Sequence, residues 1–248
     1  MAEFNEKTTV RDLAAKYSQV RPVFERYGID YCCGGLHDLE TAAAEKGVGV
    51  EMLIEALGDA IKSPVSGQAQ RDWSKSNVTD LADHIEKRHH TFMKEQLPRL
   101  AGLMATVLEA HGARHGDMLK SLKGVFESLR SEIEQHLMKE EQILFPYIRR
   151  IDEYAIEGGD APEAHCGTVQ NPIRQMEYEH DNAGRALAKM RELTSNYTLP
   201  GDACNTFRAL YDGLKALEGD LHEHIHLENN ILFPKAVETE KKLTRKDE

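Results

Sequence analysis

The chain has 248 residues, of which 40% are hydrophobic and 29% charged, a composition typical of a folded globular protein. Acidic residues outnumber basic ones by 42 to 31, and the net charge of −11 argues against a nucleic-acid partner, because phosphates are recognised by basic surfaces. The sequence contains no apolar run of the length of a membrane span and no leader-like N-terminus, so we expect a cytoplasmic protein with no membrane partner.

Residues 1–62 are predicted to form a small helical N-terminal domain. Apolar residues recur at helical spacing in TVRDLAAKYSQVRPVFERYG, and Gly28 follows as a C-terminal stop. A YCCGG turn comes next, and LETAAAEKG and VEMLIEALGDAI predict two more short helices. The polar stretch 62–76, with Pro, Gly and several Ser, predicts a linker.

Residues 77–240 are predicted to form an all-α, antiparallel four-helix bundle. Asn77 is a good N-cap for the first helix, and Pro98 within that helix should kink or break it. Strand signals are nearly absent, and the predicted helices are long enough for an up-and-down bundle. They cover approximately residues 77–112, 117–152, 171–197 and 202–239, the third starting at Asn171-Pro172 and the fourth capped by Asp202.

The bundle sequence contains one unusual segment twice, HLMKEEQILFP at 136–146 and HIHLENNILFP at 224–234. Each copy begins with a histidine and has a glutamate four residues later, so that each pair lies on one helix face, one turn apart. The apolar residues that follow indicate that this face is packed against other helices. Because a buried glutamate is costly unless it is paired or bound to a metal, the repeat predicts a metal site inside the bundle.

A single histidine on each of the other two helices completes the predicted site. His90 precedes His136 by 46 residues, and His180 precedes His224 by 44, so antiparallel hairpins would bring all four to one level. Six ligands are too many for one tetrahedral zinc but suit two metals, with iron favoured and manganese or zinc as alternatives. Two carboxylates would bridge them. The predicted ligands are His90, His136, Glu140, His180, His224 and Glu228.

Other histidines near these positions leave alternatives. His84 and His89 compete with His90 on the first helix. His222 and His226 form their own pair, but they should face about 200° away from His224 and are expected to point to solvent.

Two acids and two cysteines are further candidates. Glu132, one turn before His136, and Glu179, beside His180, are either proton relays or weak holders of a departing iron, or simply exposed acids. Cys32 and Cys33 are adjacent, too close for a normal disulfide, and precede a short helix whose N-terminus would favour thiolate. Redox chemistry, iron hand-over and docking to a client protein are the functional alternatives, and a turn with buried cysteines is the structural one.

The motifs DYCCGG, HLMKEEQILFP, EYEHDNAG and HIHLENNILFP, in this order, resemble the repair-of-iron-centres family of di-iron proteins, and the bundle resembles a hemerythrin-like domain. The resemblance covers nearly the whole chain and implies that the same six residues hold two iron ions, bridged by an oxo group and carboxylates. Hemerythrins carry HxxxH on the third helix, whereas the position four after His180 is Gly184. We expect an open coordination position there for a diatomic such as NO or O₂.

The resemblance also implies a function. The family repairs iron–sulfur clusters damaged by nitrosative or oxidative stress, so we expect iron donation to damaged iron–sulfur proteins, with NO reacting at the di-iron centre. The alternatives are an NO or O₂ buffer or sensor without turnover, and an NO reductase that forms nitrous oxide, which leaves open whether the protein is an enzyme. The small N-terminal unit also suggests a homodimer.

Overall fold

The computed structural model describes residues 4–32, 35–62, 72–158, 162 and 167–244. The described residues form helices, turns and a single isolated β-bridge, in agreement with the predicted all-α class. Within the described ranges, no helix combines the length and the apolar character that crossing a membrane would require.

The N-terminal residues form four short helices that pack around a core of their own. Thr9 and Asp38 cap the first and third helices by accepting hydrogen bonds from backbone N–H groups, and Gly28 ends the second in the left-handed conformation with φ of 66°. The core contains fully buried side chains such as Phe24 and Leu53. These helices are α1 (Val10–Lys16), α2 (Arg21–Tyr27), α3 (Leu39–Glu45) and α4 (Val50–Lys62), with a 3₁₀ turn at Ser18–Val20.

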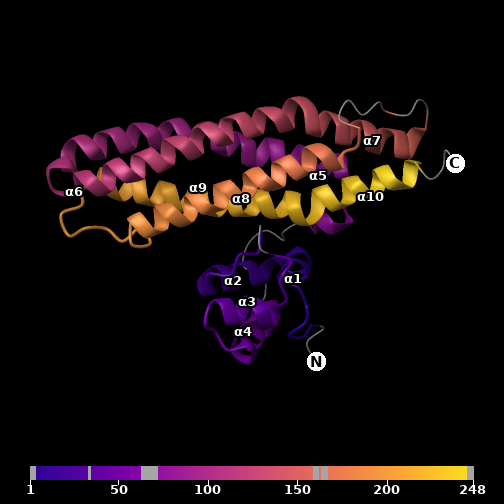
Figure 1. The fold of residues 1–248 in the computed structure, drawn as a ribbon, viewed down its shortest axis with the longest axis horizontal. Helices are drawn as coiled ribbons and strands as arrows, with labels where there is room; N and C mark the ends of the chain where they lie inside the picture. Colours follow the sequence, from indigo (N-terminus) through magenta and orange to yellow (C-terminus); the bar gives the residue numbers. More distant parts are fainter. Residues whose placement is uncertain (1–3, 33–34, 63–71, 159–161, 163–166, 245–248) are drawn as a thin grey trace.

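Four long helical rods form the rest of the structure and lie side by side as an elongated bundle (Figure 1). The chain reverses between the first two rods at His115, whose φ of −120° and ψ of 16° are not helical. Of the predicted kink or break at Pro98, the break is absent, because Pro98 lies in helical backbone. The rods are α5 (Val78–Ile85), η3 (Glu86–His90) and the first part of α6 (Thr91–Lys139); the rest of α6, η4 (Glu140–Leu144) and α7 (Phe145–Glu157); α8 (Gln170–Leu193); and α9 (Asn205–Leu227), η5 (Glu228–Leu232) and α10 (Phe233–Thr244).

The predicted start of the first rod is correct, whereas the second rod continues beyond residue 152 to Glu157 and the third and fourth have shifted ends. Asn77 caps α5 by accepting a hydrogen bond from the Asp80 N–H at 2.6 Å. The third helix already ends at Leu193, because the next turn is left-handed at residues 195–197. Cys204, not Asp202, is the residue before α9, and Asp202 instead pairs with side chains at the far turn of the bundle.

Three of the four rods contain a five-residue π-helical segment at the same level of the bundle. η3 ends at His90, η4 begins at Glu140 and η5 begins at Glu228. Such segments widen one turn and are frequent at functional sites. Phe-Pro follows both η4 and η5, and a proline in the first turn of a new α-helix loses no hydrogen bond. The repeated ILFP therefore marks the return from π to α geometry.

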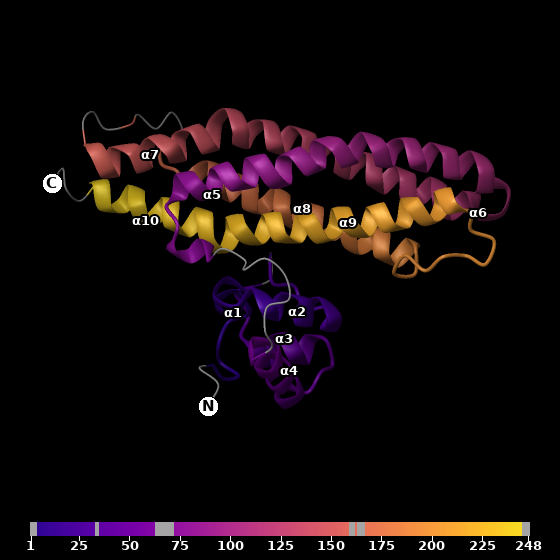
Figure 2. The same ribbon diagram turned by 180° about the vertical axis from the view of Figure 1, so that it is seen from behind.

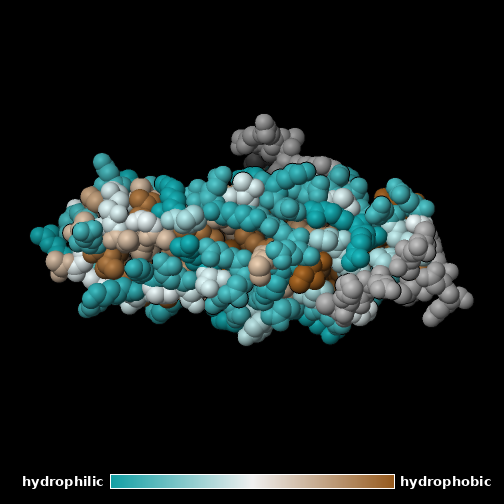
Figure 3. Space-filling model, turned by 90° about the horizontal axis from the view of Figure 1, so that it is seen from above, coloured by the Kyte–Doolittle hydropathy of each residue, from teal (hydrophilic) through white to brown (hydrophobic). Residues whose placement is uncertain are grey.

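The N-terminal helices pack against the fourth rod (Figure 2). Arg21 forms a two-oxygen ion pair with Glu223, with one Nη1–Oε2 distance of 2.6 Å. The Tyr31 ring lies edge-on to His226, with centroids 5.7 Å apart, and the Asn230 amide donates to the Tyr31 carbonyl. The opposite face of the bundle is mostly hydrophilic, with apolar side chains in separate patches (Figure 3).

Candidate metal centre

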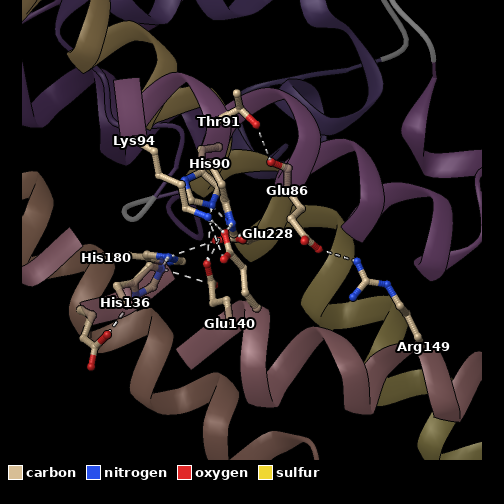
Figure 4. Close-up of polar contacts among 12 residues, drawn as sticks. Glu86, His90, Thr91, Lys94, His136, Glu140, Arg149, His180 and Glu228 are labelled. Carbon is tan, nitrogen blue, oxygen red and sulfur yellow. Dashed lines mark hydrogen bonds and ion pairs between the residues drawn. The ribbon is translucent and has the colours of Figure 1, made fainter. Parts of the chain in front are cut away.

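All six predicted ligands converge in the bundle interior, between two apolar clusters of the core. Figure 4 labels five of them, all but His224. Their ligand atoms form two groups, in each of which every atom lies within 4.8 Å of the others. Both groups contain Glu140 and Glu228, which are fully buried. The groups are His90, Glu140, His224 and Glu228, and His136, Glu140, His180 and Glu228. Two histidines on each side of two shared carboxylates is the arrangement expected for a bridged pair of metals.

The polar atoms at the centre fit a metal because histidine nitrogens and carboxylate oxygens approach each other without forming hydrogen bonds, as between Nε2 of His90 and Glu140 at 3.4 Å. Both carboxylate oxygens of Glu140, one of Glu228 and Nε2 of His90 are buried without a hydrogen-bond partner in the described structure. Removing two carboxylates from water costs several kcal/mol per ion unless cations compensate for it. The unsatisfied atoms are those that a metal would bind.

The facing nitrogens of His136 and His180 point to the same conclusion. Nδ1 of His136 lies 2.9 Å from an oxygen of Glu179, and Nδ1 of His180 lies 2.8 Å from Oδ1 of Asn229. Because both Nδ1 atoms donate to these acceptors, the two Nε2 atoms, which face each other at 3.1 Å, share one place that either a proton or a cation can occupy. Two nitrogens bound to one metal by bonds of about 2.0–2.1 Å lie roughly 2.9–3.4 Å apart, so the spacing fits a shared cation.

The residue after each shared glutamate orients a histidine of the site. Glu141 lies 2.8 Å from Nδ1 of His90 and pairs with Lys94, while Asn229 accepts from His180. Such outer partners fix the tautomer and strengthen the ligand. The sequence interpretation missed both residues, although their equal position in the two copies of the repeat is a signal that could have identified them.

The phenylalanine of each ILFP packs on the single histidine of its own half. The ring of Phe145 stacks on His90 with centroids 5.5 Å apart, and that of Phe233 stacks on His180 at 6.1 Å. The repeat therefore supplies a ligand pair, an outer partner and an aromatic wall in each copy. It encodes more of the site than the six ligands alone.

Asn229 also connects the site to the N-terminal cysteine segment. Its amide nitrogen donates to the Cys32 carbonyl at 3.2 Å, which directs its oxygen towards His180. Cys32 is buried, and its sulfur lies 3.1 Å from a carboxylate oxygen of Asp30. Cys33 lies outside the described residues. The predicted cysteine motif is thus one side chain away from a predicted ligand.

The remaining candidate acids and histidines differ in how far their side chains are buried. Glu179 accepts from His136 and pairs with Lys139, whereas Glu132 is exposed and accepts from Ser128. The expectation that His226 points to solvent is wrong, because its side chain is fully buried. Its place against the N-terminal helices, which a helical-wheel argument on one helix ignores, is the reason.

His84 and His89 belong to neither ligand group. The His84 ring stacks on Trp73 with centroids 4.3 Å apart, and Nδ1 of the buried His89 lies 3.1 Å from Asp220. Among the three competing histidines of this helix, the described structure brings only His90 into a ligand group.

A small cavity of about 20 Å³, enough for a molecule of the size of water, adjoins the site. The His136, His180 and His224 rings line it together with Glu132, Glu179 and five apolar side chains, Met93, Ile133, Leu137, Ala183 and Leu221. Gly184 does not line it. Gly184 instead lines a cleft of about 630 Å³ that also borders Cys32. The small cavity therefore lies next to the open coordination position that was expected at Gly184, and not at that position.

Metal binding should release protons from the site. Burial lowers the pKa of His136, but the Glu140 carboxylate, with help from Glu179, overcomes this effect and raises the pKa to about 10. Without metal, His136 is then protonated at neutral pH and must lose its Nε2 proton to a metal. We expect proton release on anaerobic Fe²⁺ addition at about pH 7.5, followed with an indicator dye. Apparent affinity should rise as pH increases, by about tenfold per unit for each proton displaced.

A His136→Ala variant is the control for this release. When the amounts of bound metal are taken into account, this variant should release at least one proton fewer per chain than the wild type. Equal release from both proteins would show that His136 is neutral before the metal binds.

Comparisons with known proteins agree with the geometry. Residues 81–236 match the hemerythrin HHE cation binding domain, and residues 6–61 match a domain of unknown function, DUF542. The chain is 38% identical over 226 residues to a probable iron–sulfur cluster repair protein of Haemophilus influenzae, covering 91% of this chain and 95% of the relative. It is equally similar to the iron–sulfur cluster repair protein YtfE of Escherichia coli strain UMN026, covering 91% and 94%. The chain belongs to the family of these iron–sulfur cluster repair proteins, and its bundle is a hemerythrin HHE domain.

Proposed function

We propose that the protein holds two iron ions and supports the repair of iron–sulfur clusters damaged by nitrosative or oxidative stress, in the cytoplasm, by donating iron. One observation carries the proposal: two pairs of histidines flank the same two fully buried carboxylates, Glu140 and Glu228. The relatives are named as iron–sulfur cluster repair proteins, which supports the choice of client. In this proposal both carboxylates, with an oxo group, bridge the irons.

The residues of the site keep it selective and dry. Glu141, Glu179 and Asn229 hold three of the four imidazoles with their Nε2 atoms directed inward. Iron would supply a redox-active Lewis acid at which a diatomic can bind. The apolar side chains of the small cavity disfavour charged molecules beside the site.

The cleft beside Cys32 is the proposed exit towards a client. It is lined by residues of both parts of the chain and carries charges of both signs, among them Asp30, Lys46, Asp181 and Arg185. The Cys32 thiol at its wall, with Cys33 next in sequence, provides soft ligands for iron during hand-over. This assigns the cysteine pair to iron transfer.

Iron transfer is tested directly with a protein whose [4Fe–4S] cluster has been damaged by NO. We expect the iron-loaded chain to restore the cluster's absorbance and the client's activity, and isotopic ⁵⁷Fe in the chain to appear in the client. The metal-free chain is the matched control. If the label remains in the chain while the client stays inactive, iron donation is wrong.

The same preparation separates the alternatives. Steady nitrous oxide in the headspace after addition of NO and a reductant would identify an NO reductase. A stable nitrosyl spectrum without product would identify a buffer or sensor.

A further inference from the structure

The two halves of the site are related by the internal repeat, and most of their outer contacts correspond. His90 and His180 each contact the residue after the shared glutamate of their own half, which is Glu141 in one and Asn229 in the other. Each also stacks on the phenylalanine of its half. The single histidines are therefore held in equivalent ways.

The histidines of the HxxxE pairs are not held equivalently. Glu179, the residue before His180, accepts from Nδ1 of His136. The corresponding residue before His90 is His89, whose ring lies parallel to that of His224, at 8° and with centroids 5.9 Å apart. Nδ1 of His224 is buried and has no hydrogen-bond partner among the described residues. One half thus has an acceptor where the other has a stacked ring.

Neighbouring side chains keep His89 in this position. Its Nδ1 lies 3.1 Å from Oδ1 of Asp220 without hydrogen-bond geometry, and Nη1 of Arg88 lies 3.3 Å from the same oxygen. The His89 side chain is only about 5% exposed and has little room to turn. The ring therefore covers His224 without accepting its proton.

We propose that the two metal positions differ in affinity, and that the position formed with His90 and His224 releases its iron first. Both histidines of the other position have an outer acceptor, whereas only His90 has one here. Loss of such a contact typically weakens metal binding by 10–100-fold. The inference rests on the proposed two-iron function and identifies the position that supplies the iron.

Release into a ferrous chelator tests this inference on the full chain. The protein is loaded anaerobically with two Fe²⁺ per chain and mixed with excess chelator, and the absorbance of the chelate is followed. We expect two phases of one iron each, the first at least about tenfold faster. His89→Gln places an amide beside His224 that can accept from Nδ1 and donate to Asp220, so the fast phase should slow.

Variants of Glu179 are the matched controls for the other half. Glu179→Leu removes the acceptor of His136 and should accelerate the slow phase while leaving the fast phase unchanged. Glu179→Gln keeps an acceptor and should restore slow release. Circular dichroism and the melting temperature of each metal-free variant show whether it has folded.

The outcomes distinguish the inference from the function on which it rests. A wild-type chain that binds far fewer than two irons overturns the proposed function. A chain that binds two irons but releases them in one phase overturns only the inequivalence. The assignment to His224 is wrong if His89→Gln folds, binds two irons and releases the first at the wild-type rate.

Discussion

Replacing Glu140 with alanine is expected to remove both metals, whereas replacing His136 with alanine should remove only one. Glu140 belongs to both ligand groups, so its loss leaves each with three ligands and removes one of the two carboxylates that neutralise the metal charge. His136 belongs to one group only, and the other keeps its complete set. Metal analysis after anaerobic loading and desalting should give close to zero and close to one iron per chain.

Glu132→Ala is the matched control for this experiment. Glu132 is an exposed acid on the same helix as His136 and belongs to neither group, so its variant should retain two irons. A Glu140→Ala protein that retains two irons would disprove the shared-carboxylate site. Retention of two irons by His136→Ala would show that His180 and the carboxylates suffice for the second metal.

Metal loading is expected to raise the melting temperature by roughly 8–16 °C. The metal-free site contains two fully buried glutamates and several unsatisfied nitrogen and oxygen atoms, which cost folding free energy that bound cations recover. A ligand present at about 1,000 times its dissociation constant stabilises the folded state by about 4 kcal/mol, and 1 kcal/mol shifts the midpoint of a chain of this length by about 2–4 °C. Calorimetry with and without Fe²⁺ measures the difference.

The Glu140→Ala variant separates site binding from non-specific effects. It should show almost no rise with Fe²⁺, because the site can no longer hold the metals. An equal rise in both proteins would mean that the metal stabilises the chain from elsewhere.

The positions of the predicted ligands followed from the sequence because the repeat places equivalent residues on equivalent helix faces. Two HxxxE pairs fix two helix faces, and nearly equal spacings from His90 and His180 fix the level of the other two. Hydrophobic periodicity similarly predicted the four rods and the short N-terminal helices. The repeated motif and the hydrophobic periodicity both depend on residues close together in the sequence, so they can be recognised in a single chain.

The features that the sequence did not reveal depend on contacts between distant segments. His226 is buried because Tyr31 packs on it, although the two are far apart in the chain. Proline chemistry suggested a kink or break at Pro98, which lies in helical backbone, whereas the chain reverses at His115, between the predicted helices 77–112 and 117–152. The π-helical segments widen turns to bring ligands inward, and helical periodicity assumes a constant turn. Neither the burial of His226 nor the π-helical segments have a signal within their own stretch of sequence.

The amide of Asn229 has a consequence for signalling within the molecule. Its nitrogen is bound to the Cys32 carbonyl and its oxygen to His180, so docking of the cysteine segment and the metal-binding tautomer of that imidazole are thermodynamically coupled. Coupling free energies are reciprocal: whatever strengthens docking of the segment strengthens metal binding by the same factor, and filling the site tightens the segment. A client that pulls the cysteine segment away would thereby loosen the second iron, at the position formed with His136 and His180, while an emptied protein would hold that segment less firmly.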